Sequence, residues 1–197
     1  MGRYGERLAG VTAKQAKTYL NRKRMRMSYV MVDVESDGPI PGKYSMICFG
    51  AVIVDFELNK TFYAELKPLW EDWVPEALAV SGFSRDDVLK FPEASSGIVK
   101  FDEWINANSN GKPQFISDNN GFDWQFINWY FHWFLGRNPF GFSSTNLGSL
   151  YKGFVNDSSK NFKHLRKTKH THNPVNDAIG NAEALLALIQ QGLKIRI

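Results

Sequence analysis

The sequence predicts an α/β fold in which helices flank a mixed five-stranded sheet. Three hydrophobic segments rich in β-branched residues follow one another early in the chain, which favours an antiparallel meander of strands. Beyond residue 75, helical patterns alternate with two shorter strand patterns. This order is typical of a mixed sheet with helices on its faces. A length of 197 residues, 43% of them hydrophobic, suits one domain.

Five segments are expected to form the strands. The first, SYVMVDVE, is apolar and β-branched, as buried strands are. A loop containing Gly and Pro separates it from the second, and a turn at 58–60 separates the second from the third. The expected strands cover residues 28–35, 45–55, 61–67, 114–117 and about 140–144.

Helices are expected between and after the later strands. They cover residues 75–80, a segment capped by Ser84, 94–107, 122–135 and 146–155. The last helix has the clearest boundaries, because Asn173 is its N-cap, Pro174 lies in its first turn and Gly192 ends it. Residues 157–173 are polar and basic and predict a loop.

Composition and hydropathy indicate the cellular setting. The single cysteine, Cys48, cannot form an internal disulfide, which favours a reducing compartment. The longest apolar run, residues 46–54, is too short to span a bilayer, and no apolar segment follows the first basic residues. We therefore expect a cytoplasmic protein without a signal peptide and with no membrane partner.

Charge is distributed unevenly along the chain. Residues 1–27 carry eight Lys or Arg and one acidic residue, although the net charge of the whole chain is only +4. From residue 11 this segment also lacks Gly and Pro, so we expect a basic, helical N-terminal extension over 1–27. One domain would follow over 28–197. Such an extension suits a polyanionic partner, or it is only solvated.

The first expected strand ends in two carboxylates, Asp33 and Glu35. Side chains alternate between the faces of a strand, so these two share one face, about 6.6 Å apart along the strand axis. Buried carboxylates need a neutralising partner, and a divalent cation with oxygen ligands is one such partner. The alternative is a strand end that emerges into solvent.

The segment from Ser117 to Asp123 follows a strand and opens a helix. Asp123 is expected in the first helical turn, where the helix dipole favours an ionised carboxylate. Asp118 competes for the same role. The alternative for both residues is helix capping, which is routine for Asp and Asn at a helix start.

His172 and Asp177 flank the start of the last helix. With Asn173 as the cap, His172 lies just before the helix and Asp177 in its first turn. An imidazole and a carboxylate placed in this way suit a general base beside a metal ligand. The alternative is an exposed histidine near an ordinary first-turn aspartate.

In order and setting, these three motifs resemble the 3′→5′ exonuclease superfamily in its DEDDh branch, the group of ribonuclease T, oligoribonuclease and replicase proofreading subunits. That family has Asp-x-Glu on the first strand, Asn-x-x-Phe-Asp at a helix start and His-x-x-x-x-Asp near the C-terminus. The matching segments here are Asp33 to Glu35, Asn119 to Asp123 and His172 to Asp177. The resemblance covers about residues 28–190 and implies a ribonuclease H-like exonuclease domain over 28–197, with the extension outside it.

The resemblance also implies a site for two Mg²⁺ or Mn²⁺ ions. The expected metal ligands, which are also expected to be catalytic, are Asp33, Glu35, Asp123 and Asp177. His172 would remove the proton from the attacking water. The residues expected at the terminal nucleotide are Ser36, Met46, Ile47 and Asn119. Ser36 stands where many members have threonine, and it could equally belong to a loop, as Met46 and Ile47 could belong to the core.

Two further features bear on nucleic-acid binding. The loop over 160–169 is basic and contains no acidic residue, which suits phosphate contacts from Lys163, Arg166 and Lys169, or only a solvated loop. Residues 122–134 hold eight aromatic residues. A helix that is apolar on all sides is usually buried, so we expect core or a homodimer face, with base stacking as the alternative.

Together the motifs predict a metal-dependent 3′→5′ exonuclease that acts on the 3′ ends of single-stranded DNA or RNA and releases nucleoside 5′-monophosphates. A non-catalytic nucleic-acid-binding module on the same fold is the first alternative, but it has no need of clustered carboxylates that repel phosphate. An endonuclease or integrase-type core is the second, and it gives no reason for His172. The sequence does not distinguish RNA from DNA, because that choice depends on the shape of the pocket.

Overall fold

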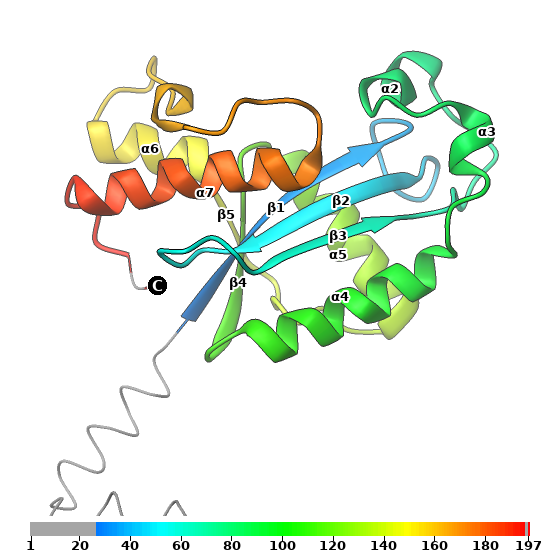
Figure 1. The fold of residues 1–197 in the computed structure, drawn as a ribbon, viewed down its shortest axis with the longest axis horizontal. Helices are drawn as coiled ribbons and strands as arrows, with labels where there is room; N and C mark the ends of the chain where they lie inside the picture. Colours follow the sequence, from blue (N-terminus) through cyan, green and yellow to red (C-terminus); the bar gives the residue numbers. More distant parts are fainter. Residues whose placement is uncertain (1–26, 196) are drawn as a thin grey trace, which may run out of the picture.

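A computed structural model describes residues 27–195 and residue 197, and it contains a mixed five-stranded sheet (Figure 1). The strands are β1 (Met27–Ser36), β2 (Met46–Ile53), β3 (Thr61–Glu65), β4 (Lys112–Ser117) and β5 (Ser144–Asn146), in the order β3-β2-β1-β4-β5. The pairs β1–β2 and β2–β3 are antiparallel, whereas β1–β4 and β4–β5 are parallel. The sheet confirms the predicted fold class and places β1 at its centre.

Helices cover both faces of this sheet (Figure 1). They are α2 (Pro75–Val80), α3 (Arg85–Val88), α4 (Ala94–Asn108), α5 (Asn120–Leu135), α6 (Leu147–Val155) and α7 (Pro174–Gln190). One hydrophobic core lies between the sheet and α4 and α5, and a second lies between the sheet and α6 and α7. Within residues 27–195, no helix is both long and apolar enough to cross a membrane.

Three regions of the chain differ from the sequence prediction or fall outside the described residues. The fifth strand was expected at 140–144 but begins at Ser144, because residues 138–141 form a hydrogen-bonded turn in which Gly141 has a φ of +81°. A short 3₁₀ helix, Lys163–Leu165, interrupts the expected loop. The helix expected within residues 1–27 lies outside the described residues, although Met27 itself belongs to β1.

The aromatic residues of α5 divide between the core and the surface. Phe126, Tyr130 and Phe131 are fully buried, which confirms the expected core role for these side chains. Trp133, by contrast, is 60% exposed. The composition of α5 alone suggested burial on all sides. The helix is instead buried on one side only, because one of its faces turns away from the sheet.

Gly50 allows α7 to pack directly on β2. A Cβ atom at this position would lie 2.4 Å from the backbone carbon of Pro174 and 2.4 Å from the backbone nitrogen of Val175. Real Cβ atoms do not approach a backbone so closely, so any larger residue would displace the start of α7. Gly50 is also the partner of Asp33 in the register of β1 and β2. The absence of a side chain therefore sets the distance between α7 and the carboxylates of β1.

We predict that Gly50→Ala lowers the free energy of unfolding by about 1–3 kcal/mol, because the added methyl group overpacks a contact with backbone atoms that cannot rotate away. Thermal or denaturant unfolding measures this. Gly153→Ala is the matched control, because a Cβ at Gly153 on α6 meets nothing within 4 Å. That change should leave stability unchanged or raise it by up to about 1 kcal/mol. Equal effects of the two substitutions would contradict the close packing at Gly50.

Candidate active site

Three carboxylates converge at the carboxyl end of β1. Asp33 and Glu35 extend from the same face of β1, as the alternation of side chains predicts. Asp177 comes from the first turn of α7 and is 1% exposed. One oxygen from each of the three carboxylates lies within 4.8 Å of the others. The sequence prediction that these residues meet is therefore matched by their positions.

The start of α7 is fixed by its cap. The side-chain oxygen of Asn173 accepts hydrogen bonds from the backbone N–H groups of Val175 and Asn176, at 3.2 and 3.1 Å. Pro174 occupies the first position of the helix, where a backbone N–H would have no hydrogen-bond acceptor within the helix. Together with the contact at Gly50, the cap holds Asp177 over β1.

Asp123 reaches the same strand from α5. It is 2% exposed, and its Oδ1 accepts a hydrogen bond from the backbone N–H of Val34 at 3.2 Å. Asp118, the competing candidate, instead forms an ion pair with Arg166 at 3.1 Å. Asp123 therefore lies beside the carboxylates of β1, and Asp118 is neutralised by a cation of its own.

The clustered carboxyl groups have abnormal acidity. Burial raises the pKa of Asp33 well above its usual value, and the charges of Asp123, Glu35 and Asp177 raise it further. Burial, followed by the charge of Asp177, raises the pKa of Glu35 to about 7. Burial raises the pKa of Asp123 to about 8. At neutral pH the cluster therefore tends to retain protons unless another positive charge replaces them.

A divalent cation fits this set of donors. Oδ2 of Asp123 and Oδ2 of Asp177 are buried without a hydrogen-bond partner among the described residues. Unpartnered buried carboxylate oxygens are costly, and they are the ligands that hard cations such as Mg²⁺ prefer. The chemistry of the donors and their convergence thus favour a metal site made of oxygen atoms.

Two histidines border the carboxylates. Nδ1 of His172 lies 3.7 Å from Oε1 of Glu35, and Nδ1 of His170 lies 2.9 Å from Oδ1 of Asp177. The two rings contact each other, with centroids 4.4 Å apart. His172 also has a φ of +57°, which is uncommon outside glycine and marks a specially held backbone. The sequence prediction named His172 alone and did not foresee that His170 contacts Asp177.

The loop that carries both histidines is held by α7. The carboxylate of Glu183 accepts hydrogen bonds from the backbone N–H groups of Lys167 and Thr168, at 2.8 and 2.7 Å, and from the Thr168 hydroxyl. Arg166 donates to Asp118 and to Asn181, and its side chain is 9% exposed. No feature of the sequence pointed to Glu183, because two of its three hydrogen-bond donors are backbone N–H groups and all three lie in a loop distant in the sequence.

The residues expected at the substrate have mixed positions. Met46 and Ile47 are fully buried, so their side chains belong to the core. Ser36 is also buried, and its hydroxyl donates to the Gly38 carbonyl. Arg166 is committed to its ion pair and is poorly placed for phosphate. The remaining three, Asn119, Lys163 and Lys169, are exposed, so their proposed substrate contacts stay predictions.

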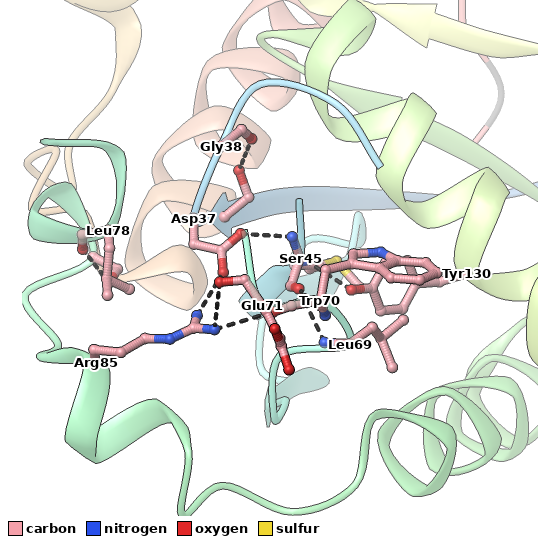
Figure 2. Close-up of polar contacts among 12 residues, drawn as sticks. Asp37, Gly38, Ser45, Leu69, Trp70, Glu71, Leu78, Arg85 and Tyr130 are labelled. Atoms are coloured by element: carbon pink, nitrogen blue, oxygen red, sulfur yellow. Dashed lines mark hydrogen bonds and ion pairs between the residues drawn. The ribbon is translucent and has the colours of Figure 1, made fainter. Parts of the chain in front are cut away.

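A buried ion pair stabilises the segment that follows β1. Figure 2 shows Asp37 between the Arg85 guanidinium, 3.0 Å away, and the backbone N–H of Ser45, 2.6 Å away. Arg85 also donates to the carbonyl of Trp70, and the Tyr130 hydroxyl accepts from the N–H of Met46. Since Asp37 is fully buried, these contacts fix the exit of β1 and the entry of β2. Long-range pairing of this kind left no signal in the sequence.

Comparisons with known proteins reveal one sequence relative and several structural ones. No family model matches the chain. Over 128 residues it is 44% identical to the 3′-5′ DNA exonuclease Cap18 of Escherichia coli, an alignment that covers 64% of this chain and 68% of that protein.

Solved structures share the fold at low sequence identity. The nuclease domain of 3′hExo, a DEDDh family member bound to rAMP, superposes with a TM-score of 0.67 at 17% identity, covering 87% of this chain and 94% of that chain. A zinc-bound complex of E. coli ExoI with single-stranded DNA superposes with a TM-score of 0.65 at 16% identity, covering 86% of this chain and 41% of that one. Both are proteins with which this chain shares its architecture.

Proposed function

This chain belongs to the DEDDh family of 3′→5′ exonucleases, and we propose that it degrades single-stranded nucleic acid from the 3′ end to nucleoside 5′-monophosphates. What supports this proposal most is the convergence of Asp33, Glu35 and Asp177 at the end of the central strand. A pure binding module gains nothing from such a cluster, because its negative charge repels phosphate.

Asp33, Glu35, Asp123 and Asp177 would hold two Mg²⁺ or Mn²⁺ ions. When bound, such ions offset the negative charge of the phosphodiester, favour ionisation of the attacking water and stabilise the leaving 3′ oxygen. The protein's own part is to keep four carboxylates close together in a largely buried site, as β1, α5 and α7 do. Burial raises the pKa values of Asp33, Glu35 and Asp123, and the same low-dielectric surroundings strengthen the attraction between the carboxylates and a cation.

His172 is the proposed general base. Its side chain is half exposed, which leaves it open to solvent, and it borders Glu35 within the same site. A general base must be neutral to accept a proton, and a neutral imidazole has a nitrogen lone pair that can do so. His170, in contact with Asp177, would orient that carboxylate and the substrate.

DNA is the proposed substrate class, since the relative at 44% identity is named a DNA exonuclease. The structural neighbours do not decide the matter, because their described complexes include rAMP, an RNA stem-loop and single-stranded DNA. Activity on oligonucleotides of DNA and of RNA that have the same sequence and length distinguishes the two substrate classes directly.

The single cysteine, buried Cys48, is consistent with action in a reducing compartment such as the cytoplasm.

We predict that the purified protein converts a 5′-labelled single-stranded oligonucleotide into a ladder of shortened products in the presence of Mg²⁺. Asp33→Asn and Asp177→Asn should abolish the ladder, while each variant stays folded, because removing one of several repelling charges does not weaken the metal-free protein. Glu103→Gln, on the exposed side of α4, is the charge-matched control and should retain full activity. Internal cuts, or near wild-type turnover by either aspartate variant, would contradict the proposal.

A second prediction separates the two histidines. His172→Ala should lower turnover by roughly 10²–10⁴-fold and leave Mg²⁺ binding nearly intact, as expected for loss of a general base. His170→Ala should act mainly on the KM for the oligonucleotide. Turnover and KM are measured over a pH series at fixed Mg²⁺ concentration. If His170→Ala is the inactive variant and His172→Ala the mild one, the base has been assigned to the wrong histidine.

A further inference from the structure

A hollow of about 540 Å³ opens beside the outward face of α5, beyond the carboxylate site. Its walls come from three tryptophans and several polar side chains of α5, together with Pro41 from the loop that joins β1 to β2. A volume of this size suits a small organic ligand. None of the carboxylates of the candidate active site lines it.

The aromatic wall of this hollow presents a flat surface to solvent. The rings of Trp129 and Trp133 are stacked, with centroids 4.8 Å apart and an angle of 13° between their planes. The ring of Trp70 packs against both rings in T-shaped arrangements, with its centroid 6.3 Å from each of theirs. This support holds Trp133 in place although the residue is 60% exposed. An exposed indole held rigidly in a stack is a ready platform for another aromatic ring.

The polar wall has hydrogen-bonding atoms to spare. Gln125 donates from Nε2 to the Pro39 carbonyl, and Asn128 accepts from the Asn138 amide, both at 2.9 Å. Among the described residues, the carbonyl oxygen of Gln125 and the amide nitrogen of Asn128 have no hydrogen-bond partner. His132 adds an exposed imidazole. Free amide atoms beside an aromatic face are the combination that recognises the edge and the face of a nucleobase.

The lining of the hollow carries no negative charge that would repel a polyanion. None of its lining residues is acidic. A second hollow, of about 390 Å³ beside the turn between β2 and β3, differs because two acidic residues, Glu57 and Glu183, line it together with one cation, Lys167. The net negative charge of that lining disfavours phosphate groups, whereas no carboxylate lines the hollow at α5. Of these two hollows, the one at α5 suits a nucleic acid strand better.

The hollow is connected to the end of β1 through the loop that joins β1 to β2. Pro41 lies in the loop that leaves β1 at Ser36, directly after Glu35, and the bond from Gln125 to Pro39 ties α5 to this loop. Asp123, at the start of α5, belongs to the carboxylate site, so one helix serves both places. A strand with its 3′ end at the carboxylates can therefore follow α5 to the hollow.

We propose that this hollow binds a base of the substrate strand upstream of the cleaved nucleotide, by stacking on Trp133 and hydrogen bonding to Gln125 and Asn128. The proposal rests on the proposed exonuclease function, because that function supplies the strand. It predicts that affinity grows with the length of the oligonucleotide until the strand reaches α5, and that this gain depends on Trp133.

The test measures binding of 5′-fluorescein-labelled oligothymidylates, from a dinucleotide to a dodecamer, by fluorescence anisotropy. The protein carries Asp33→Asn so that no cleavage occurs. Adding Trp133→Ala should weaken dodecamer binding by about 5- to 150-fold, the range expected for loss of one stacked base, and leave dinucleotide binding unchanged. Trp133→Phe, which keeps an aromatic ring, should retain part of the dodecamer affinity that Trp133→Ala loses. Phe56→Ala, which removes a 78% exposed ring at the β2–β3 turn, is the control and should change neither affinity.

Three outcomes would overturn the proposal: an equal loss for both lengths, no loss for the dodecamer, or a change from dimer to monomer in sedimentation with unchanged length dependence. The last would assign the face to a second copy of the chain. Failure of the wild-type protein to cleave, together with a length-dependent loss in Trp133→Ala, would refute the proposed catalysis and leave the stacking site standing.

Discussion

The close approach of buried carboxylates is the constraint on which the rest of the site depends. At the 4.8 Å within which oxygens of Asp33, Glu35 and Asp177 lie, two full charges repel each other by about 3.5 kcal/mol at an effective dielectric constant of 20. That is a large fraction of the stability of a typical domain, so the cluster cannot exist fully ionised on its own. Protons or cations have to neutralise it. The raised pKa values show the first solution, and the unpartnered oxygens point to the second.

The fold supplies the energy that keeps these groups together. A hydrophobic core packs against each face of the sheet, and β1 is paired with a strand on both sides. The backbone that carries Asp33 and Glu35 is therefore held in place, and the two carboxylates have little freedom to move apart. Gly50 allows the backbone of α7 to touch β2, and the Asn173 cap starts the helix at the position that directs Asp177 inward. The Asp37–Arg85 pair then fixes the chain just beyond the site. Each of these contacts fixes the positions of the carboxylates, and none of them takes part in the proposed reaction.

Local patterns in the sequence were sufficient to predict where the carboxylates lie on the strand and in the helices. The period of a strand placed Asp33 and Glu35 on one face, and helix-start signals placed Asp123 and Asp177 in first turns. Features set by packing between distant parts of the chain were missed. The role of Gly50 depends on its contact with the start of α7, and the role of Glu183 depends on its hydrogen bonds to the loop that carries the histidines. Likewise, a three-residue strand such as β5 carries too few residues for a reliable pattern, and a turn displaced it.

The most direct test of the carboxylate cluster is the number of protons released when Mg²⁺ binds. Isothermal titration calorimetry at pH 7, repeated in buffers with different ionisation enthalpies, measures it. In the metal-free protein the pKa of Glu35 is about 7 and that of Asp123 about 8, so both groups are partly protonated and must lose these protons to bind a cation. We expect release of roughly one proton or more per protein, and weak or absent binding in Asp177→Asn. Mg²⁺ binding without proton release, or undiminished binding in that variant, would contradict the account.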